Sequence, residues 1–326
     1  MSTKWRRTAA AAVGVALGAL VAGCGPSGTV DGDRQYTIGV TTLFSSPIIN
    51  GYTAGMQAEA DKRGITLKVN TADSNVGKEA SIIDTYITQQ VDAILIDPIS
   101  DSGSIPAVQR AVAAGITVLC YDTCIQEDAK ASMIKGYVTS DQTALGREAG
   151  EAAAKYIAED LGGKAKIGML TCDQSYAICA QRRDGFLSAL APGSYEIVAK
   201  QEGYVVDKAR PLATDMLTAN PDLGLIFGQN EGSTIGAALA VKSAGRTGTH
   251  VVGIDITPVI AQLMTEPDPA LVFTAGQGAE ELGQKAIGLA VDALEGRPQA
   301  ETQYAGLLPY SASDQAGLAA YLSTHN

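Results

Sequence analysis

The sequence predicts an α/β protein with two similar lobes, each built on a doubly wound parallel sheet. From residue 36 onward, short apolar runs alternate with helical patterns, and the alternation begins a second time near residue 134. The runs lack the polar–apolar alternation of half-exposed strands, which is typical of strands buried on both faces of a parallel sheet. Polar residues follow several runs, and open α/β sheets bind ligands outside the carboxyl ends of their strands.

The first half of the chain contains four expected strands with helices between them. Pro47 suits the first turn of a helix, because a proline lacks the amide hydrogen that this position does not use. Gly115 suits the C-terminal end of another helix. We expect strands at 36–41, 65–71, 93–96 and 117–121, and helices at 47–63, 77–90 and 105–114.

The second half repeats this pattern after a polar loop. Repeated strand–helix units imply right-handed crossovers, with helices on both faces of each sheet. Two such lobes would enclose a cleft lined by strand ends, and small-molecule sites favour such interfaces. We expect strands at 134–139, 166–170, 196–202, 225–227, 251–254 and 271–275, and helices at 143–161, 180–190, 208–219, 233–244, 259–265 and 280–295.

The first 23 residues have the features of an export signal. Basic residues precede an apolar run at 9–22, which is too short to span a bilayer with margin. Residues 20–24 read Leu-Val-Ala-Gly-Cys and resemble the lipobox of bacterial lipoproteins, which implies cleavage before Cys24 and its acylation. The alternatives are an ordinary secretory signal with an incidental cysteine and a buried helix. Residues 24–34 have linker composition, so we expect a lipid-anchored tether.

Composition and motifs argue against several classes of function. The net charge is −11 and no basic patch stands out, which argues against nucleic acid as a partner. His250 and His325 both fall outside the predicted cleft, so neither a Ser-His-Asp arrangement nor a histidine-rich metal spacing is supported. Residues 276–278 read Gly-Gln-Gly and lack the third glycine of a dinucleotide fingerprint. We therefore expect no catalysis, no cofactor and no metal.

Seven segments in the right order resemble the bacterial sugar-binding proteins of the ribose/galactose type. Residues 227–231, Phe-Gly-Gln-Asn-Glu, resemble the Phe-x-x-Asn-Asp/Glu of that family, and residues 251–258 resemble its strand-Asp-x-x-Pro segment. The other matching segments are 182–186, 42–61, 73–75, 96–98 and 140–141. With the lipobox, the resemblance implies a periplasmic binding protein of type I, the extracytoplasmic solute-binding lipoprotein of an ABC importer.

The resemblance also implies how the chain divides into domains. Two lobes joined by a three-strand hinge would close on the ligand, with crossings near residues 139–141, 276–278 and 304–307. The first lobe would hold residues 35–139 plus 278–305. The second would hold residues 140–277 plus 306–326.

The family's binding residues fall at strand ends of this sequence. Its Asn, Asp and Gln correspond to Asn230, Asp255 and Gln277, whose carboxylate and amide groups suit sugar hydroxyls. Asp255 could instead cap the next helix, and Gln277 could brace the hinge. Asp122 matches a first-lobe Asp of the family, with a plain turn residue as the alternative. We expect Glu231 mainly to favour its helix N-terminus electrostatically.

The opposite wall departs from the family pattern. The family's first-lobe Arg is Thr123 here, and its second-lobe binding Arg aligns with Ala180, while Arg182 matches a more structural position. Ile48 and Ile49 replace an aromatic pair that would stack on a sugar ring. This puts a standard aldohexose or ribose in doubt and favours a pentose, a polyol or a modified sugar. Further candidate contacts are Thr41, Ser46 and Asn50 in the first lobe, and Tyr176 and Tyr204, unless these are surface tyrosines, in the second.

Four cysteines remain after Cys24, and an exported location permits disulfides. Four cysteines allow three pairings. We favour Cys120 with Cys124 and Cys172 with Cys179, because a bridge between lobes would lock the hinge. Free buried thiols or a thiolate metal site are the alternatives.

The expected partners are a small sugar or polyol, ABC permease subunits, and the extracytoplasmic face of the membrane through Cys24, with the protein itself a monomer. A receptor that presents its ligand to a membrane chemosensor or sensor kinase is the second hypothesis. An enzyme on the same fold is the third.

Overall fold

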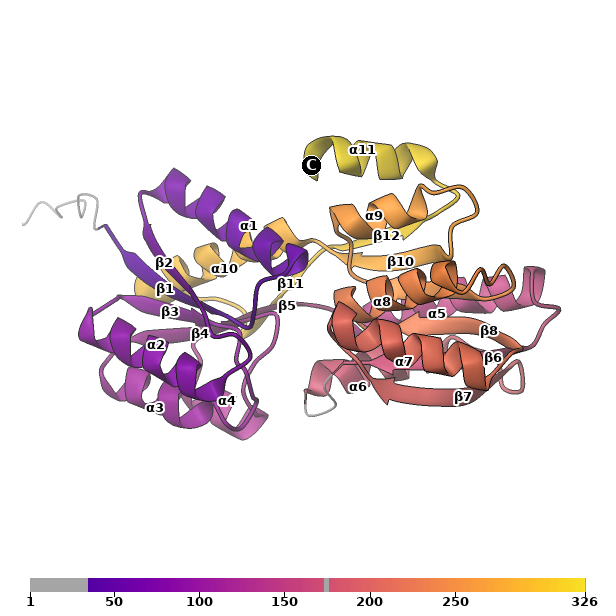
Figure 1. The fold of residues 1–326 in the computed structure, drawn as a ribbon. Coiled ribbons are helices and arrows are strands. Elements are labelled where there is room, and N and C mark those ends of the chain that lie inside the picture. The colour runs from indigo at the N-terminus through magenta and orange to yellow at the C-terminus, as the bar shows by residue number, and fades with distance from the viewer. Residues whose placement is uncertain (1–34, 173–175, 326) are drawn as a thin grey trace, which may run out of the picture. The chain divides into compact units, whose positions relative to one another are not determined.

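The computed structural model describes residues 35–172 and 176–325, and these residues form two α/β lobes, as predicted (Figure 1). Within them, one six-stranded sheet has the order β11-β5-β4-β3-β1-β2 and the other β12-β10-β9-β8-β6-β7. The two orders correspond strand for strand. In this part of the chain β12 runs antiparallel to β10, and the other paired strands are parallel.

The first sheet and its helices carry most of the N-terminal half. Its strands are β1 (Thr37–Thr42), β2 (Thr66–Thr71), β3 (Ala93–Ile96), β4 (Thr117–Tyr121), β5 (Tyr137–Ser140) and β11 (Thr302–Ala305). The helices are α1 (Pro47–Arg63), α2 (Val76–Thr88), α3 (Ile105–Ala113), α4 (Glu127–Met133) and α10 (Ala279–Leu294).

The second sheet is built in the same way. Its strands are β6 (Ala165–Thr171), β7 (Tyr195–Glu202), β8 (Leu223–Gly228), β9 (His250–Ile254), β10 (Leu271–Gln277) and β12 (Leu307–Ser311). The helices are α5 (Gln142–Glu159), α6 (Ala177–Ser188), α7 (Val206–Ala219), α8 (Glu231–Ser243), α9 (Pro258–Met264) and α11 (Gln315–His325).

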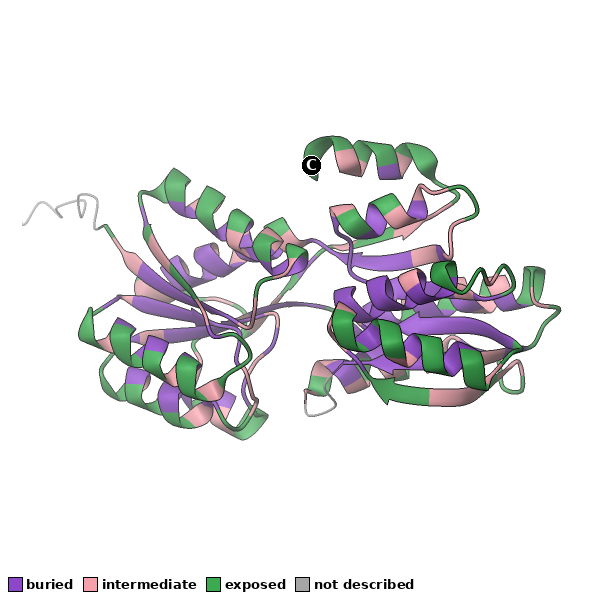
Figure 2. Ribbon diagram, viewed as in Figure 1, coloured by how far each residue is buried: buried purple, intermediate pink, exposed green. Residues whose placement is uncertain are grey.

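Strand β3 shows why an unbroken apolar run belongs in the middle of such a sheet. Successive side chains of a strand point to opposite faces. Ala93 and Leu95 therefore join the core under α1 and α10, whereas Ile94 and Ile96 join the core under α2 and α3. The central strands are buried and the helices turn exposed faces outward (Figure 2). Each lobe thus has a core on both faces of its sheet.

Several elements differ from the prediction. The expected strand at 134–139 begins only at Tyr137. Helix α4 occupies the end of the expected polar loop, and Ile134 is the C-cap of that helix. The edge strands β11 and β12 have mixed, partly exposed sequences and β12 contains Pro309, so they show no apolar run. Helix α11 was also missed, since Leu318 is its one buried residue among those described.

The chain passes between the two sheets at three short segments. They follow β5, follow β10, and join β11 to β12. The domain boundaries at 139/140, 277/278 and 305/306 stay a prediction about which residues move together.

None of the helices within 35–172 and 176–325 is long and apolar enough to cross a membrane.

Candidate ligand-binding site

A cavity of about 210 Å³ lies between the two lobes, where the strand ends of both sheets meet. Asn230 follows β8, Asp255 follows β9 and Gln277 ends β10. These strands are neighbours in the sheet, so their carboxyl ends bring the three side chains together. Six predicted residues line the cavity: Asp122, Tyr176, Tyr204, Asn230, Asp255 and Gln277.

Asp255 links the start of α8 to the end of β10. Its Oδ2 accepts a hydrogen bond from the Glu231 amide at 2.7 Å, and its Oδ1 accepts one from Gln277 Nε2, also at 2.7 Å. The expected alternative role, capping the next helix, is wrong: Thr257 is the N-cap of α9, and its hydroxyl accepts from the Ile260 amide. Asp255 has φ 77°, a left-handed conformation that aspartate tolerates better than most residues.

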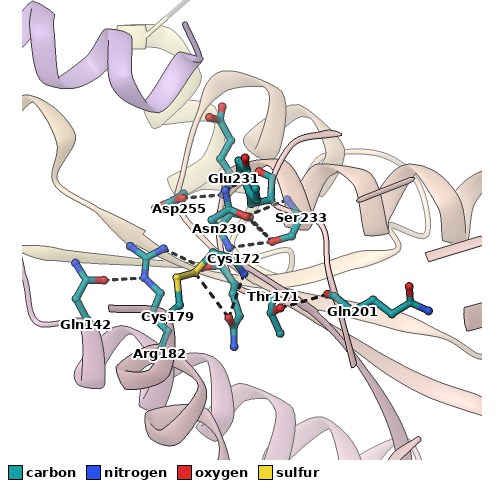
Figure 3. The surroundings of a disulfide bond; sticks show 12 residues. Gln142, Thr171, Cys172, Cys179, Arg182, Gln201, Asn230, Glu231, Ser233 and Asp255 are labelled. Atoms are coloured by element: carbon teal, nitrogen blue, oxygen red, sulfur yellow. Dashed lines mark hydrogen bonds between the residues drawn. A yellow bond between two sulfur atoms is a disulfide. The ribbon is translucent and has the colours of Figure 1, made fainter. Parts of the chain in front are cut away.

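Asn230 has a structural task in addition to its place on the cavity wall (Figure 3). It is the N-cap of α8. Its backbone amide donates to Ser233 Oγ at 2.9 Å, and its side-chain Oδ1 accepts from that hydroxyl at 2.8 Å. Its Nδ2 donates to the Tyr204 carbonyl at 2.8 Å. This capping box could have been predicted from the sequence, because asparagine is a preferred N-cap residue and Ser233 stands three positions later.

Gln277 connects the two lobes and retains an acceptor. Its Nε2 also donates to the Tyr52 hydroxyl on α1 at 3.3 Å. Its Oε1 is buried, and no described residue donates to it. Since a buried acceptor without a partner is costly, a ligand hydroxyl at this point would complete the site. The bracing role and the ligand contact are therefore compatible.

Asp122 forms the first-lobe side of the same hydrogen-bond chain. Its Oδ1 accepts from the Tyr52 hydroxyl at 3.1 Å, and its carbonyl accepts from the hydroxyls of Tyr137 and Thr139. The pKa of Asp122 is raised to about 6, because burial raises it more than Arg182 lowers it and the charge of Asp255 acts in the same direction as burial. Asp122 is therefore linked by hydrogen bonds through Tyr52 to Gln277.

Arg182 and Tyr52 are cavity residues that were not predicted as ligand contacts. Arg182 is buried, its Nε donates to Gln142 Oε1 at 2.7 Å and its Nη1 donates to the Gln229 carbonyl at 2.8 Å (Figure 3). Tyr52 lies one helical turn after Ile48, and both line the cavity. Helical spacing could have identified Tyr52. Phe44 also lines the cavity, four residues before Ile48.

The other three candidates lie outside the wall of this cavity. Thr41 is fully buried within β1. Ser46 is the N-cap of α1, where its Oγ accepts from the Ile49 amide. Asn50 is exposed and lines a neighbouring cavity of about 520 Å³ among α1, α9, α10 and α11, which shares Ile48 and Gln277 with the first.

The favoured disulfides are present, and both are within a lobe. Cys120 pairs with Cys124 and Cys172 pairs with Cys179. Because all four thiols are oxidised, the cross-lobe, free-thiol and thiolate-metal alternatives are wrong. Across the described residues, no cluster of three or more His, Cys, Asp or Glu could hold a metal ion. Cys24 lies outside the described residues.

The site accepts more hydrogen bonds than it donates. Asp122, Asp255 and Gln277 offer oxygens, and Arg182 is the cation on the described wall. Asp97 lies just behind, where its Oδ1 accepts from Thr123 at 2.6 Å and burial raises its pKa. Such a wall suits a ligand with several hydroxyl donors.

A family model described as a periplasmic binding protein domain matches residues 40–298. The chain is 34% identical over 236 residues to the ABC transporter periplasmic-binding protein YphF of Escherichia coli, covering 71% of this chain and 72% of that protein. It is 31% identical over 250 residues to the xylitol-binding protein of Mycolicibacterium smegmatis, covering 76% and 68%. It is 29% identical over 271 residues to the ribose import binding protein RbsB of Bacillus subtilis, covering 82% and 85%.

Solved structures share the fold. An ABC transporter solute-binding protein from Mycobacterium smegmatis with bound glycerol superposes with a TM-score of 0.79 at 26% identity, covering 86% of this chain and 96% of that one. A galactofuranose-binding protein gives a TM-score of 0.80 at 23% identity, covering 89% and 99%.

Proposed function

The chain belongs to the periplasmic binding protein family, and on that premise we propose that it is the extracytoplasmic solute-binding protein of an ABC importer. Its ligand is a small polyhydroxylated molecule, a sugar or polyol, held in the cavity between the lobes by hinge closure. Two of the relatives named above are binding proteins for xylitol and ribose, and a structural neighbour holds glycerol. The role is therefore capture and delivery of a solute to ABC permease subunits, without catalysis.

One observation carries the proposal more than any other. The acceptors of Asp255, Gln277 and Asp122 converge on one cavity from both lobes, linked through Tyr52. Carboxylates bind hydroxyl donors strongly, since charge-assisted hydrogen bonds are about twice as strong as neutral ones. The volume of about 210 Å³ is below the range of roughly 300–1,000 Å³ that is usual for drug-sized ligands. The ligand is therefore compact, of the size of a pentose or a short polyol.

We expect a compact polyol or pentose to raise the unfolding temperature of the purified protein. A ligand that binds only the folded state adds about 2.7 kcal/mol at 100 times its Kd, and each kcal/mol shifts Tm by roughly 2–4 °C in a chain of this size. The measurement is a thermal-shift screen of xylitol, glycerol, ribose, arabinose and glucose. The expected result is a rise of roughly 5–10 °C with the best compound.

Two variants locate the bound compound. Gln277→Ala should weaken binding by about tenfold or more, because a buried hydrogen-bonding group is lost. Asn50→Ala, in the first turn of α1 but outside the lining of the ligand cavity, should bind as the unmodified protein does. A screen in which no sugar or polyol shifts Tm at 10 mM, roughly the top of the useful range for weak binders, would contradict the proposed ligand class.

We also propose that Cys24 is acylated and anchors the protein to the membrane. The lipobox resemblance supports this, and residues 24–34 would be the tether. In a bacterial host fed a labelled fatty acid, the full chain should take up label and sediment with membranes. Cys24→Ala should lose both properties, whereas Ser27→Ala in the tether should keep them. Label on the Cys24→Ala protein would contradict the assignment.

A further inference from the structure

Glu231 reaches from one lobe to the other beside the ligand cavity. It is the first residue of α8 in the second lobe, and only 5% of it is exposed. Its Oε2 accepts a hydrogen bond from the Ile48 amide in the first lobe at 3.5 Å. We propose that Glu231 is a positioning residue that joins the lobes, holding the first turn of α1, and with it the cavity wall, against the second lobe.

The first turn of α1 lacks one acceptor that Glu231 supplies. The first amides of a helix have no partner within the helix. Pro47 has no amide hydrogen, the Ile49 amide donates to Ser46 Oγ, and the Asn50 amide donates to the Ser46 carbonyl. The Ile48 amide therefore has no acceptor within α1 or its N-cap. A carboxyl from the other lobe bonds it, at the helix end where negative charge is favoured.

The contact bears directly on the shape of the cavity. Ile48, Ile49 and Tyr52 all line it, and all three belong to the segment that Glu231 holds. The backbone amide of Glu231 donates to Asp255, so one residue connects the α1 wall with the polar wall. Every group in this link belongs to the protein itself, so the contact does not depend on the proposed function.

The charged surroundings of Glu231 give the contact a pH dependence. The pKa of Glu231 is raised to about 7, because burial and then the charge of Asp255 raise it by more than hydrogen bonds from Ser46, Ile48 and Thr257 lower it. The first turn of α1 carries no acidic residue. On α11, Tyr321 feels the charge of Glu231, and His325 stacks on Tyr321 with ring centroids 4.1 Å apart.

The direction of this pH dependence follows from the change in the pKa of Glu231 when the lobes separate. The carboxyl then returns toward water, and its pKa falls toward the ordinary value of 4.5. The joined state therefore prefers the protonated form. Lobe contact is strongest at and below the ordinary pKa and weakens as pH rises through about 7.

The test is hydrogen exchange of the ligand-free, purified protein at pH 6 and pH 8.5, corrected for the intrinsic exchange rate. We expect the amides at 48–52 to lose protection at the higher pH, by up to about tenfold if the whole pKa difference is expressed. Glu231→Gln keeps an acceptor but cannot ionise, so its protection should be high and independent of pH. Glu231→Ala should lose protection at both pH values.

Two matched variants separate this contact from other titrations. Glu280→Gln removes an exposed carboxylate from the first turn of α10, and His325→Gln removes the nearby imidazole. Both should keep the pH dependence of the unmodified protein. The proposal is overturned if Glu231→Gln still shows that dependence, or if protection at 48–52 does not change with pH. Glu231→Gln alone decides the matter if Glu231→Ala does not fold.

Discussion

Replacing Asp255 with alanine is expected to lower the free energy of unfolding by about 3 kcal/mol and to abolish ligand-induced stabilisation. The carboxylate accepts from the Glu231 amide and from Gln277 Nε2, and it is 3% exposed. Each buried donor left without a partner costs roughly 1–3 kcal/mol. Thermal unfolding should therefore begin roughly 6–12 °C lower. A thermal melt, with and without the best compound of the screen, measures both effects.

The unusual backbone of Asp255 needs its own control. Alanine fits a left-handed conformation less well than aspartate, at a cost of up to about 1 kcal/mol. Asp268 has φ 51°, close to the 77° of Asp255, but it is exposed. Asp268→Ala should therefore show the backbone cost alone, and its ligand response should be unchanged. Equal losses in the two variants would mean that the Asp255 carboxylate contributes little.

Parts of the fold could be predicted because the decisive physics is local. Helix α1 was placed correctly at both ends, since Pro47 opens it and Gly64, with φ 65°, closes it. Strand β3 was placed at its observed ends because burial on both faces leaves four apolar residues in a row. By contrast α4 and β12 depend on what packs over them, and their sequences carry no equally strong period.

The site shows the same division between local and tertiary information. The resemblance to the sugar-binding family, added to the topology rule about strand ends, pointed to Asp122, Asp255 and Gln277. It could not show that Arg182 turns its guanidinium toward the cavity, because this depends on how α6 packs. Nor could it show that Glu231 reaches Ile48, since those residues are 183 positions apart in the chain.

The packing of α1 on α10 gives the other large expected effect. The two helices approach so closely that a Cβ at Gly283 would lie 2.0 Å from the Tyr52 carbonyl oxygen. No side chain can rotate away from that contact, because both partners are backbone atoms or fixed to them. Gly283→Ala should therefore force α10 away from α1 and lower the free energy of unfolding by about 3 kcal/mol, despite the better helix propensity of alanine.

Gly288 on the same helix supplies the matched control. A Cβ there would meet only the end of the Arg63 side chain, at 4.0 Å. Gly288→Ala should therefore stabilise the protein by about 0.5–1 kcal/mol through helix propensity alone. Because Tyr52 hydrogen-bonds to Asp122 and Gln277, Gly283→Ala should also weaken ligand binding, while Gly288→Ala should not. Chemical denaturation measures both stabilities, and equal effects of the two substitutions would show that α1 and α10 do not meet at Gly283.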